Sequence, residues 1–144
     1  MKIKLLDENI KLPEKSHLPD VGLDIFIPES FDLKPLETKT IGLKITVAIP
    51  EGFAGMLVPR SSIAEKGLII QTSIIDPDYI GEIHLIITNC SNNVVSVEKN
   101  QRLCSLVCVS VLNTYLEKVD ELYSTTRFEN GLGSSGKWIN ELKD

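Results

Sequence analysis

Three carboxylates and a phenol are concentrated in the stretch 74–82, which lies between two apolar runs. Asp76 and Asp78 flank Pro77, whose ring fixes its own φ and biases Asp76 toward extended geometry. Tyr79 follows directly. The stretch could carry acid–base chemistry, but Asp-Pro-Asp also occurs in acidic surface hairpins for conformational reasons alone.

A second cluster, Arg60, Ser61 and Ser62, stands where a strand-like run ends. We expect a short helix over 62–66, capped by Ser61 or Ser62 and ended by Gly67. The N-terminus of a helix presents N–H groups and a positive partial charge that suit phosphate, and Arg60 adds bidentate donors. The alternative is a capped helix with a surface arginine.

A third candidate, Asp24, interrupts the apolar run 22–27. If its side chain points inward, it must be paired or lie close to a metal-bound water. If it points outward, it is an ordinary carboxylate at the edge of a sheet. Arg102 opens the last long apolar run, where a plain turn is the alternative.

The C-terminal stretch 124–144 is polar and rich in Gly and Ser, and we expect a mobile arm there. Its glycines match two nucleotide-binding patterns, but too little chain follows for the βαβ structure that either fold needs, so both folds are rejected. Its backbone N–H groups, hydroxyls and cations could still meet an anion: Arg127, Gly131, Gly133, Ser134, Ser135, Gly136 and Lys137. The alternative is a disordered tail.

Composition bounds the class of protein. The 144 residues fit one domain with a real core, 42% are apolar, and the net charge of −5 makes a nucleic-acid polymer an unexpected partner. The three cysteines include no C-x-x-C pair, so we expect free thiols rather than a zinc site. Neither a signal peptide nor a membrane span is expected, and we predict a cytoplasmic protein.

Short β-like runs recur between breaks at Pro, Gly and Asn. They cover residues 2–6, 22–27, 31–33, 40–49, 55–58, 68–71, 83–88, 94–97 and 102–112. This pattern predicts an all-β sandwich, jelly roll or barrel over 1–123, with at most one short helix and a weaker helix candidate at 116–122. The runs 83–88 and 102–112 are apolar on both faces, so another subunit is a candidate cover for one of them.

Taken in order, these pieces resemble the five motifs of the trimeric dUTPases. The matching segments are Val-Gly-Leu-Asp24, Pro-Arg60-Ser-Ser, Ile-Ile-Asp76-x-Asp-Tyr79-x-Gly-Glu82, Gln-Arg102-Leu and Arg127-x-x-x-Gly-x-Gly-Ser-Ser-Gly136. The resemblance implies a distorted jelly-roll homotrimer that hydrolyses dUTP to dUMP and pyrophosphate with Mg²⁺. Such a reaction keeps uracil out of DNA and supplies dUMP for thymidylate synthesis. One subunit would supply a hairpin that holds uracil and deoxyribose, a second would bind the phosphates, and the arm would close over the site.

The residue chemistry agrees with the roles that the resemblance implies. Asp76 would orient a water for attack on the α-phosphorus and accept its proton. Tyr79 would exclude a ribose 2′-hydroxyl, and Arg60 and Arg127 would stabilise charge on the phosphoryl group. Asp24 would bind Mg²⁺ through water, because Mg²⁺ retains several waters. Other implied substrate contacts are Ser61, Ser62, Ser73, Ile74, Leu132, Gly133, Ser134 and Ser135.

Several positions depart from the family pattern. Leu132 stands where an aromatic ring usually covers uracil, and Phe128 stands where Gly is common. Ser73 replaces a common Gly of the uracil hairpin, and Ser105 replaces a Gln that usually reaches the phosphates. We expect Asp78 to be structural or solvated, not part of a catalytic pair.

Three alternatives differ in chemistry. A dCTP deaminase shares the fold, but its proton-shuttling Glu corresponds to Ile86 here, and an Arg that it uses corresponds to Glu65. A non-enzymatic nucleotide-binding regulator would need no intact catalytic set. A structural trimer would leave the motifs without a role.

Overall fold

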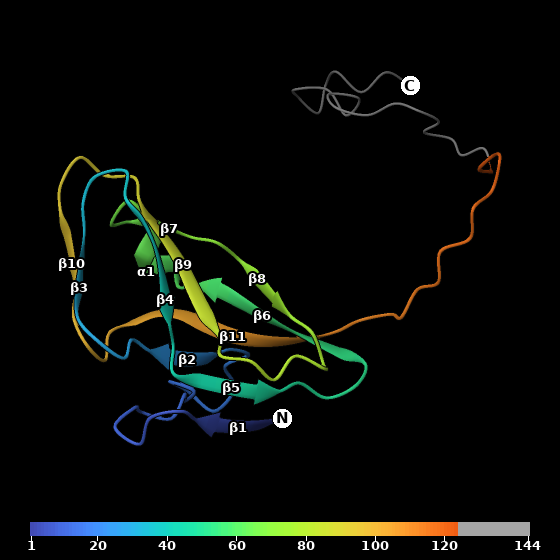
Figure 1. Cartoon of the computed structure of the whole chain (residues 1–144), viewed down its shortest axis with the longest axis horizontal. Helices are drawn as coiled ribbons and strands as arrows, with labels where there is room; N and C mark the ends of the chain where they lie inside the picture. Colours follow the sequence, from blue (N-terminus) through green and yellow to red (C-terminus); the bar gives the residue numbers. More distant parts are fainter. Residues whose placement is uncertain (124–144) are drawn as a thin grey trace. The chain divides into compact units, whose positions relative to one another are not determined.

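The computed structural model describes residues 1–123, and the compact unit within them spans Met1–Asn113 (Figure 1). The described residues form β1 (Lys2–Leu5), β2 (Leu23–Phe26), β3 (Phe31–Leu33), β4 (Thr38–Gly42), β5 (Ile45–Ala48), β6 (Phe53–Pro59), α1 (Ser61–Ala64), β7 (Leu68–Ile70), β8 (Ser73–Ile75), β9 (His84–Asn89), β10 (Val95–Val97) and β11 (Arg102–Ser110). The expected all-β class with one short helix is confirmed over these residues.

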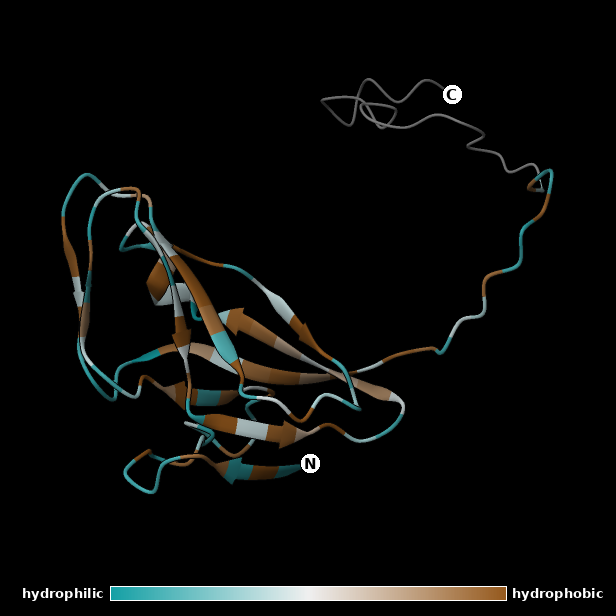
Figure 2. Cartoon of the chain, in the orientation of Figure 1, coloured by the Kyte–Doolittle hydropathy of each residue, from teal (hydrophilic) through white to brown (hydrophobic). Residues whose placement is uncertain are grey.

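The strands form four antiparallel sheets with the orders β2-β11-β6-β8, β4-β9-β7, β1-β5 and β10-β3. Apolar side chains from all four sheets meet in one buried cluster, and Figure 2 shows hydrophobic colour along much of β6, β9 and β11. On β9 burial alternates: Leu85 and Ile87 are buried, but Ile86 is 37% exposed. Within one chain, therefore, only one face of β9 is covered.

A register shift in β11 decides which side chains share a face. Ser105 pairs with Asp24, and the register shifts between Arg102 and Cys104, so Arg102 pairs with Phe26. Without the shift Arg102 would pair with Ile27, on the opposite face from Asp24, because side chains alternate along a strand. The bulge thus brings Arg102 and Asp24 to the same side of the sheet.

The expected single strand over 40–49 is wrong: the chain forms β4 and β5, which belong to different sheets. Lys44, between them, has a φ of 56°. A residue with a Cβ rarely adopts this backbone conformation, so a lysine at this position does not signal a break between two strands.

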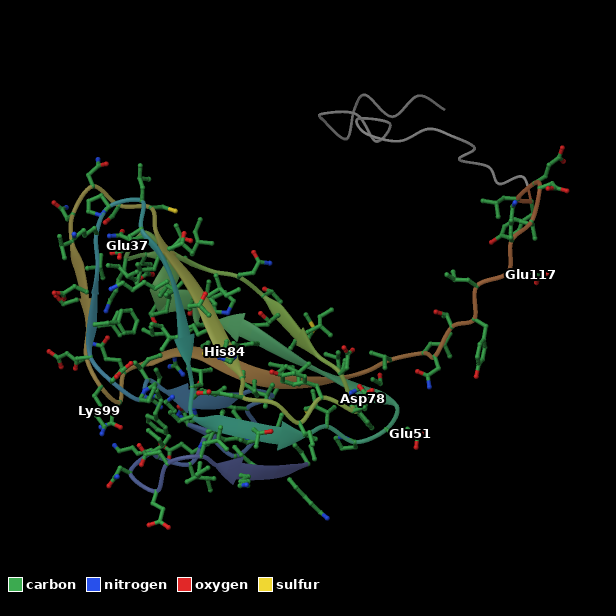
Figure 3. All side chains as sticks on the ribbon, viewed as in Figure 1. Glu37, Glu51, Asp78, His84, Lys99 and Glu117 are labelled. Atoms are coloured by element: carbon green, nitrogen blue, oxygen red, sulfur yellow. The ribbon has the colours of Figure 1, made fainter. Side chains whose placement is uncertain are left out.

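The apolar runs on either side of the acidic stretch form β7 and β9, which pair antiparallel as the expected hairpin requires, but their connection contains a further strand. β8 was missed by the sequence and pairs with β6, whereas β9 pairs with β4 and β7. The residues between β8 and β9, which we call the 76–83 loop, therefore carry the chain from one sheet to another. Asp78 lies on this loop and is exposed (Figure 3).

The helix expectations need two corrections. Arg60, not Ser61 or Ser62, occupies the N-cap of α1, with no side-chain capping bond, and the helix ends before Gly67, which donates its N–H to the Ala64 carbonyl at 3.0 Å. The candidate helix 116–122 is wrong, because residues 114–123 carry neither helix nor strand and are exposed. α1 itself has only four residues, and a helix of this length depends on tertiary packing. Over residues 1–123, none of the helical structure combines the length and hydrophobicity needed to span a membrane.

Candidate functional site

A cationic pocket of about 270 Å³ lies where β6 ends and β11 begins. It is lined by Arg60, Ser62, Ile63, Lys66, Gln101, Arg102 and Leu103. The two segments are joined by the Arg60 N–H, which donates to the Leu103 carbonyl at 3.0 Å. Three cations and no carboxylate line this pocket, so it suits a multiply charged anion such as a phosphate chain.

Asp24 lies behind these arginines and is 5% exposed. Its Oδ2 is ion-paired with Arg60 and lies 3.2 Å from Nη1 of Arg102. Ser16 donates to the same oxygen at 2.9 Å and accepts from Arg102 at 2.7 Å, while Ser105 donates to Oδ1 at 2.7 Å. The inward-facing, paired alternative for Asp24 is therefore the observed one.

The surroundings of Asp24 set the ionisation states of its own carboxyl group and of the nearby Cys104 thiol. Burial alone would raise the pKa of Asp24, but hydrogen bonds from Ser105, Arg60 and Ser16, with the charge of Arg60, outweigh burial and lower the pKa below its ordinary value. Burial, assisted by the Asp24 charge, raises the pKa of the Cys104 thiol to about 12. Asp24 is thus an anion at neutral pH, and Cys104 is a neutral packing group.

A second pocket, of about 220 Å³, lies beside the 76–83 loop. It is lined by Ser73, Ile74, Ile75, Asp76, Tyr79, Glu82, Ile83, His84 and Ile86. The loop begins with a turn in which the Tyr79 N–H donates to the Asp76 carbonyl at 3.1 Å, with Pro77 in the position where its fixed φ is favourable. This turn brings the Asp76 carboxylate and the Tyr79 ring to the same pocket.

The Tyr79 ring is packed over its own loop and is 44% exposed. Its hydroxyl donates to the Glu82 carbonyl at 2.8 Å. A Cβ at Gly81 would lie 2.5 Å from that hydroxyl, so Gly81 is needed for close approach. The ring is therefore held against the backbone, with one surface left for a ligand.

The two pockets share no lining residue and lie toward opposite ends of β6. Ile75 pairs with Gly55, so Asp76, one residue further on, continues that register to Ala54. Arg60 follows the far end of β6, six positions along the chain from Ala54, which corresponds to about 20 Å in an extended strand. Within one chain, these two side chains cannot reach the same phosphorus atom.

The structure gathers most of the described site residues into these pockets. Asp76, Tyr79, Ser73 and Ile74 line one, and Arg60 and Ser62 line the other, whereas Ser61 is exposed and lines neither. Arg127, Leu132, Gly133, Ser134 and Ser135 lie outside the described residues. Sequence reasoning missed the site positions of Ser16, Lys66 and His84. Gln101 and Arg102 were named in a motif, and Ser105 was named only as a departure from the family pattern.

A metal site made wholly of protein side chains is absent from residues 1–123, where no three His, Cys, Asp or Glu side chains cluster suitably. Arg60, Lys66 and Arg102, which line the cationic pocket, are positively charged and cannot hold a metal ion directly. Asp24 is compatible with an indirect role, because Oδ1 accepts one hydrogen bond among these residues and a carboxylate oxygen can accept a second. This donor set fits a hydrated Mg²⁺ that is carried by a phosphate ligand.

Comparison with known proteins gives a consistent result. A family model described as dUTPase matches residues 8–136. A deoxyuridine 5′-triphosphate nucleotidohydrolase of Trichodesmium erythraeum is 37% identical, over 94% of this chain and 98% of that protein.

Solved structures agree in fold. Staphylococcus bacteriophage 80alpha dUTPase with dUPNHPP is 33% identical, with a TM-score of 0.88 over 94% of this chain and 97% of that one. A mutant dUTPase from phage phi11 of S. aureus, described with a structural Mg(II) ion, is 29% identical, with a TM-score of 0.78 over 83% of this chain and 96% of that one. The expected jelly roll is confirmed by these similarities.

Proposed function

The chain belongs to the dUTPase family, and we propose on this premise that it hydrolyses dUTP to dUMP and pyrophosphate. The observation that carries the proposal is the position of Asp76 and Tyr79 in one pocket, beside the backbone edge of β8. A carboxylate, an aromatic ring and an extended backbone are the groups needed to hold a nucleoside and to activate water near its phosphate. The cationic pocket supplies the groups that a triphosphate needs.

Asp76 is the proposed general base. It would accept a proton from a water while the water oxygen forms a bond to the α-phosphorus and the bond from that phosphorus to the bridging oxygen of pyrophosphate breaks. The carboxylate is exposed at the mouth of the pocket, where water can reach it. The rigid turn that begins at Asp76 limits the geometries that this carboxylate can adopt.

Tyr79 is the proposed sugar filter. Its hydroxyl is occupied by the Glu82 carbonyl, so the ring contributes a surface rather than a hydrogen bond to the ligand. A deoxyribose can lie against that surface, whereas a 2′-hydroxyl would need space that the ring fills. Uracil would be held by the backbone edge at Ser73 and Ile74, above Ile86.

Arg60, Arg102 and Lys66 would bind the phosphates, with Ser62 as a further donor. In the proposed reaction the two guanidinium groups stabilise charge that moves to the leaving pyrophosphate. Asp24 holds both guanidinium groups in place before the substrate arrives. Arg127, Leu132, Gly133, Ser134 and Ser135 would complete the phosphate and uracil contacts.

Mg²⁺ is the metal that the family uses, and the donor set around Asp24 fits it. Bound with the triphosphate, Mg²⁺ would offset phosphate charge. The part assigned to the chain is to accept a hydrogen bond from metal-bound water at Asp24 and to keep Arg60 and Arg102 facing the phosphates.

We further propose that the working unit is a homotrimer. The register places Asp76 beside Ala54, and Arg60 lies six positions further along the chain through β6, which corresponds to about 20 Å. The two residues can therefore act on the same phosphoryl group only if they come from different chains. Closed rings of identical chains bring different surfaces of neighbouring copies together. We assign the activity to the cytoplasm, where the three free thiols suit a reducing compartment.

The test is pyrophosphate release from dUTP, dTTP, dCTP and UTP with Mg²⁺. We expect a clear preference for dUTP and its loss in Asp76→Asn, because an amide cannot accept the proton. Asp78→Asn is the matched control: Asp78 is exposed on the same loop and lines neither pocket, so this variant should keep most of the activity. Absence of a dUTP preference, or full activity in Asp76→Asn, would refute the proposal.

Deamination of dCTP is the chemical alternative to exclude. The pocket has Ile86 where a deaminase needs a proton-shuttling carboxylate, and the Glu82 carboxylate is occupied by Lys44. Ammonia release from dCTP should therefore be absent, and its detection would contradict the assignment.

A further inference from the structure

Two segments that carry the chain between sheets meet beside the second pocket, which Tyr79 lines. The turn after β4 leads to β5, and the 76–83 loop leads from β8 to β9. They are joined at Glu82, whose Oε1 accepts the Lys44 N–H at 3.0 Å and lies 3.6 Å from the Lys44 ammonium. One carboxylate thus ties together two connections that are far apart in sequence.

The position of this carboxylate is built into the surrounding backbone. Lys44 has a φ of 56°, which is unfavourable for a residue with a Cβ, and the Glu82 carboxylate stabilises that conformation by accepting its N–H. Gly42 leaves the space that the carboxylate occupies, since a Cβ there would overlap Oε1 of Glu82. The bond to the Lys44 N–H and the space beside Gly42 together fix the Glu82 side chain, even though Glu82 is partly exposed.

Glu82 also fixes the ring of Tyr79 through its main chain. The Glu82 carbonyl accepts the Tyr79 hydroxyl at 2.8 Å and lies 2.9 Å from Nδ1 of His84. The same part of the loop is tied to β5 by Thr46, whose hydroxyl donates to the Ile80 carbonyl at 2.6 Å. The loop that carries Tyr79 is therefore anchored at both Ile80 and Glu82.

We propose that Glu82 is a positioning residue for sugar selection, which sets the depth of the Tyr79 ring by anchoring the 76–83 loop to Lys44. This inference rests on the proposed role of Tyr79 in excluding ribose. A steric filter works only if the ring cannot retreat, and a shift of about 1 Å is enough to loosen such a site. The side chain of Glu82 prevents that retreat without contacting the sugar, because its carboxylate is turned to Lys44.

The experiment compares kcat/KM for dUTP and for UTP in the full-length protein. Glu82→Ala should lower the dUTP-to-UTP ratio about tenfold, mainly through improved use of UTP, while kcat for dUTP changes by less than about threefold. Glu82→Gln should restore most of the ratio, because an amide oxygen can still accept the Lys44 N–H. Glu51→Ala, at an exposed glutamate on the β5–β6 turn, is the control and should leave the ratio unchanged (Figure 3).

Glu82→Asp provides a second test if the alanine variant does not fold. Its carboxylate is one methylene shorter and withdraws from Lys44, so the ratio should again fall. A folded Glu82→Ala or Glu82→Asp protein with the wild-type ratio would overturn the inference. A wild-type protein that uses UTP as well as dUTP would instead refute the proposed role of Tyr79, so the two failures are distinguishable.

Discussion

The hydroxyl of Ser105 donates a 2.7 Å hydrogen bond to Oδ1 of Asp24, its direct partner in the pairing of β11 with β2. This bond fixes one carboxylate oxygen, so that the other faces Arg60 and Arg102. Ser105 thereby affects the cationic pocket without lining it. The serine side chain is short, and Ser105 reaches the carboxylate because it lies directly opposite Asp24 in the strand pair.

Ser105→Ala should destabilise the fold by about 1 kcal/mol, because a largely buried carboxylate loses a hydrogen-bond donor. It should also lower kcat/KM for dUTP, since Asp24 would hold the arginines less firmly. The free energy of unfolding is measured by denaturant titration and the activity by pyrophosphate release. Ser110→Ala, at the exposed end of the same strand, should change neither quantity. Equal behaviour of the two variants would show that the bond to Asp24 has no such effect.

Acid should destabilise the protein through Asp24. Its folded-state pKa lies below the unfolded value of 3.8, so its stabilising contribution is complete above that value and is lost as the pH falls through the folded pKa. We expect the free energy of unfolding of the wild type to decrease below about pH 4. In Asp24→Asn this part of the pH dependence should be absent.

A matched control separates Asp24 from other acids. Hydrogen bonds from Asn9 lower the pKa of Asp7 as well, but Asp7 is exposed. Asp7→Asn should therefore keep most of the acid sensitivity. Denaturant titrations from pH 3 to pH 7 measure these slopes, and a wild-type slope in Asp24→Asn would contradict the assignment.

Gly81→Ala should impair dUTP binding. The added Cβ would lie 2.5 Å from the Tyr79 hydroxyl, so the ring or the loop must move. We expect a higher KM for dUTP and a lower dUTP-to-UTP ratio, because the ring is the proposed sugar filter. Ile80→Ala changes the neighbouring side chain, which is 76% exposed, and should have a smaller effect on the ratio. An unchanged ratio in Gly81→Ala would argue against close packing of Tyr79.

The sequence was sufficient for the all-β class because periodic apolar runs and their breaks are local properties. The prediction from sequence failed where the chain passes from one sheet to another. The left-handed Lys44 is not a residue type that marks a break, and its conformation depends on Glu82, far away in the chain. β8 is only three residues long and lies directly before the acidic turn, so neither this strand nor its pairing with β6 was predicted.

The candidate site shows the same division. Asp76, Tyr79 and Arg60, which line the two pockets, could be named as candidates because their residue types and order are informative in themselves. For Arg102 the sequence left a plain turn as the alternative to a functional role. Its contact with Asp24 depends on a one-residue register shift in β11. Ser16 reaches Asp24 from a loop, and Ser105 reaches it across a strand pair. Such contacts depend on tertiary pairing, which periodicity does not specify.

Complementation between two inactive variants tests whether the site is shared between chains. Asp76→Asn removes the proposed base and Arg60→Ala removes a proposed phosphate-binding cation, so each homo-oligomer should lose most of its activity. If Asp76 and Arg60 of one site come from different subunits, a mixed oligomer can combine an intact Asp76 from one variant with an intact Arg60 from the other. The variants are co-expressed with different affinity tags, and mixed oligomers are isolated by sequential purification.

Random mixing in equal amounts gives each site an intact Asp76 with a chance of one half and an intact Arg60 with the same chance. About one quarter of the sites should then be intact, so an unselected mixture should recover about one quarter of the wild-type rate. If both residues served the same site from one chain, every site would carry one defect and no activity would return. Mixing Asp76→Asn with Asp76→Asn bearing the second tag is the control, because it exchanges subunits without restoring a base. Recovery in that control would mean that residual activity, not complementation, is being measured.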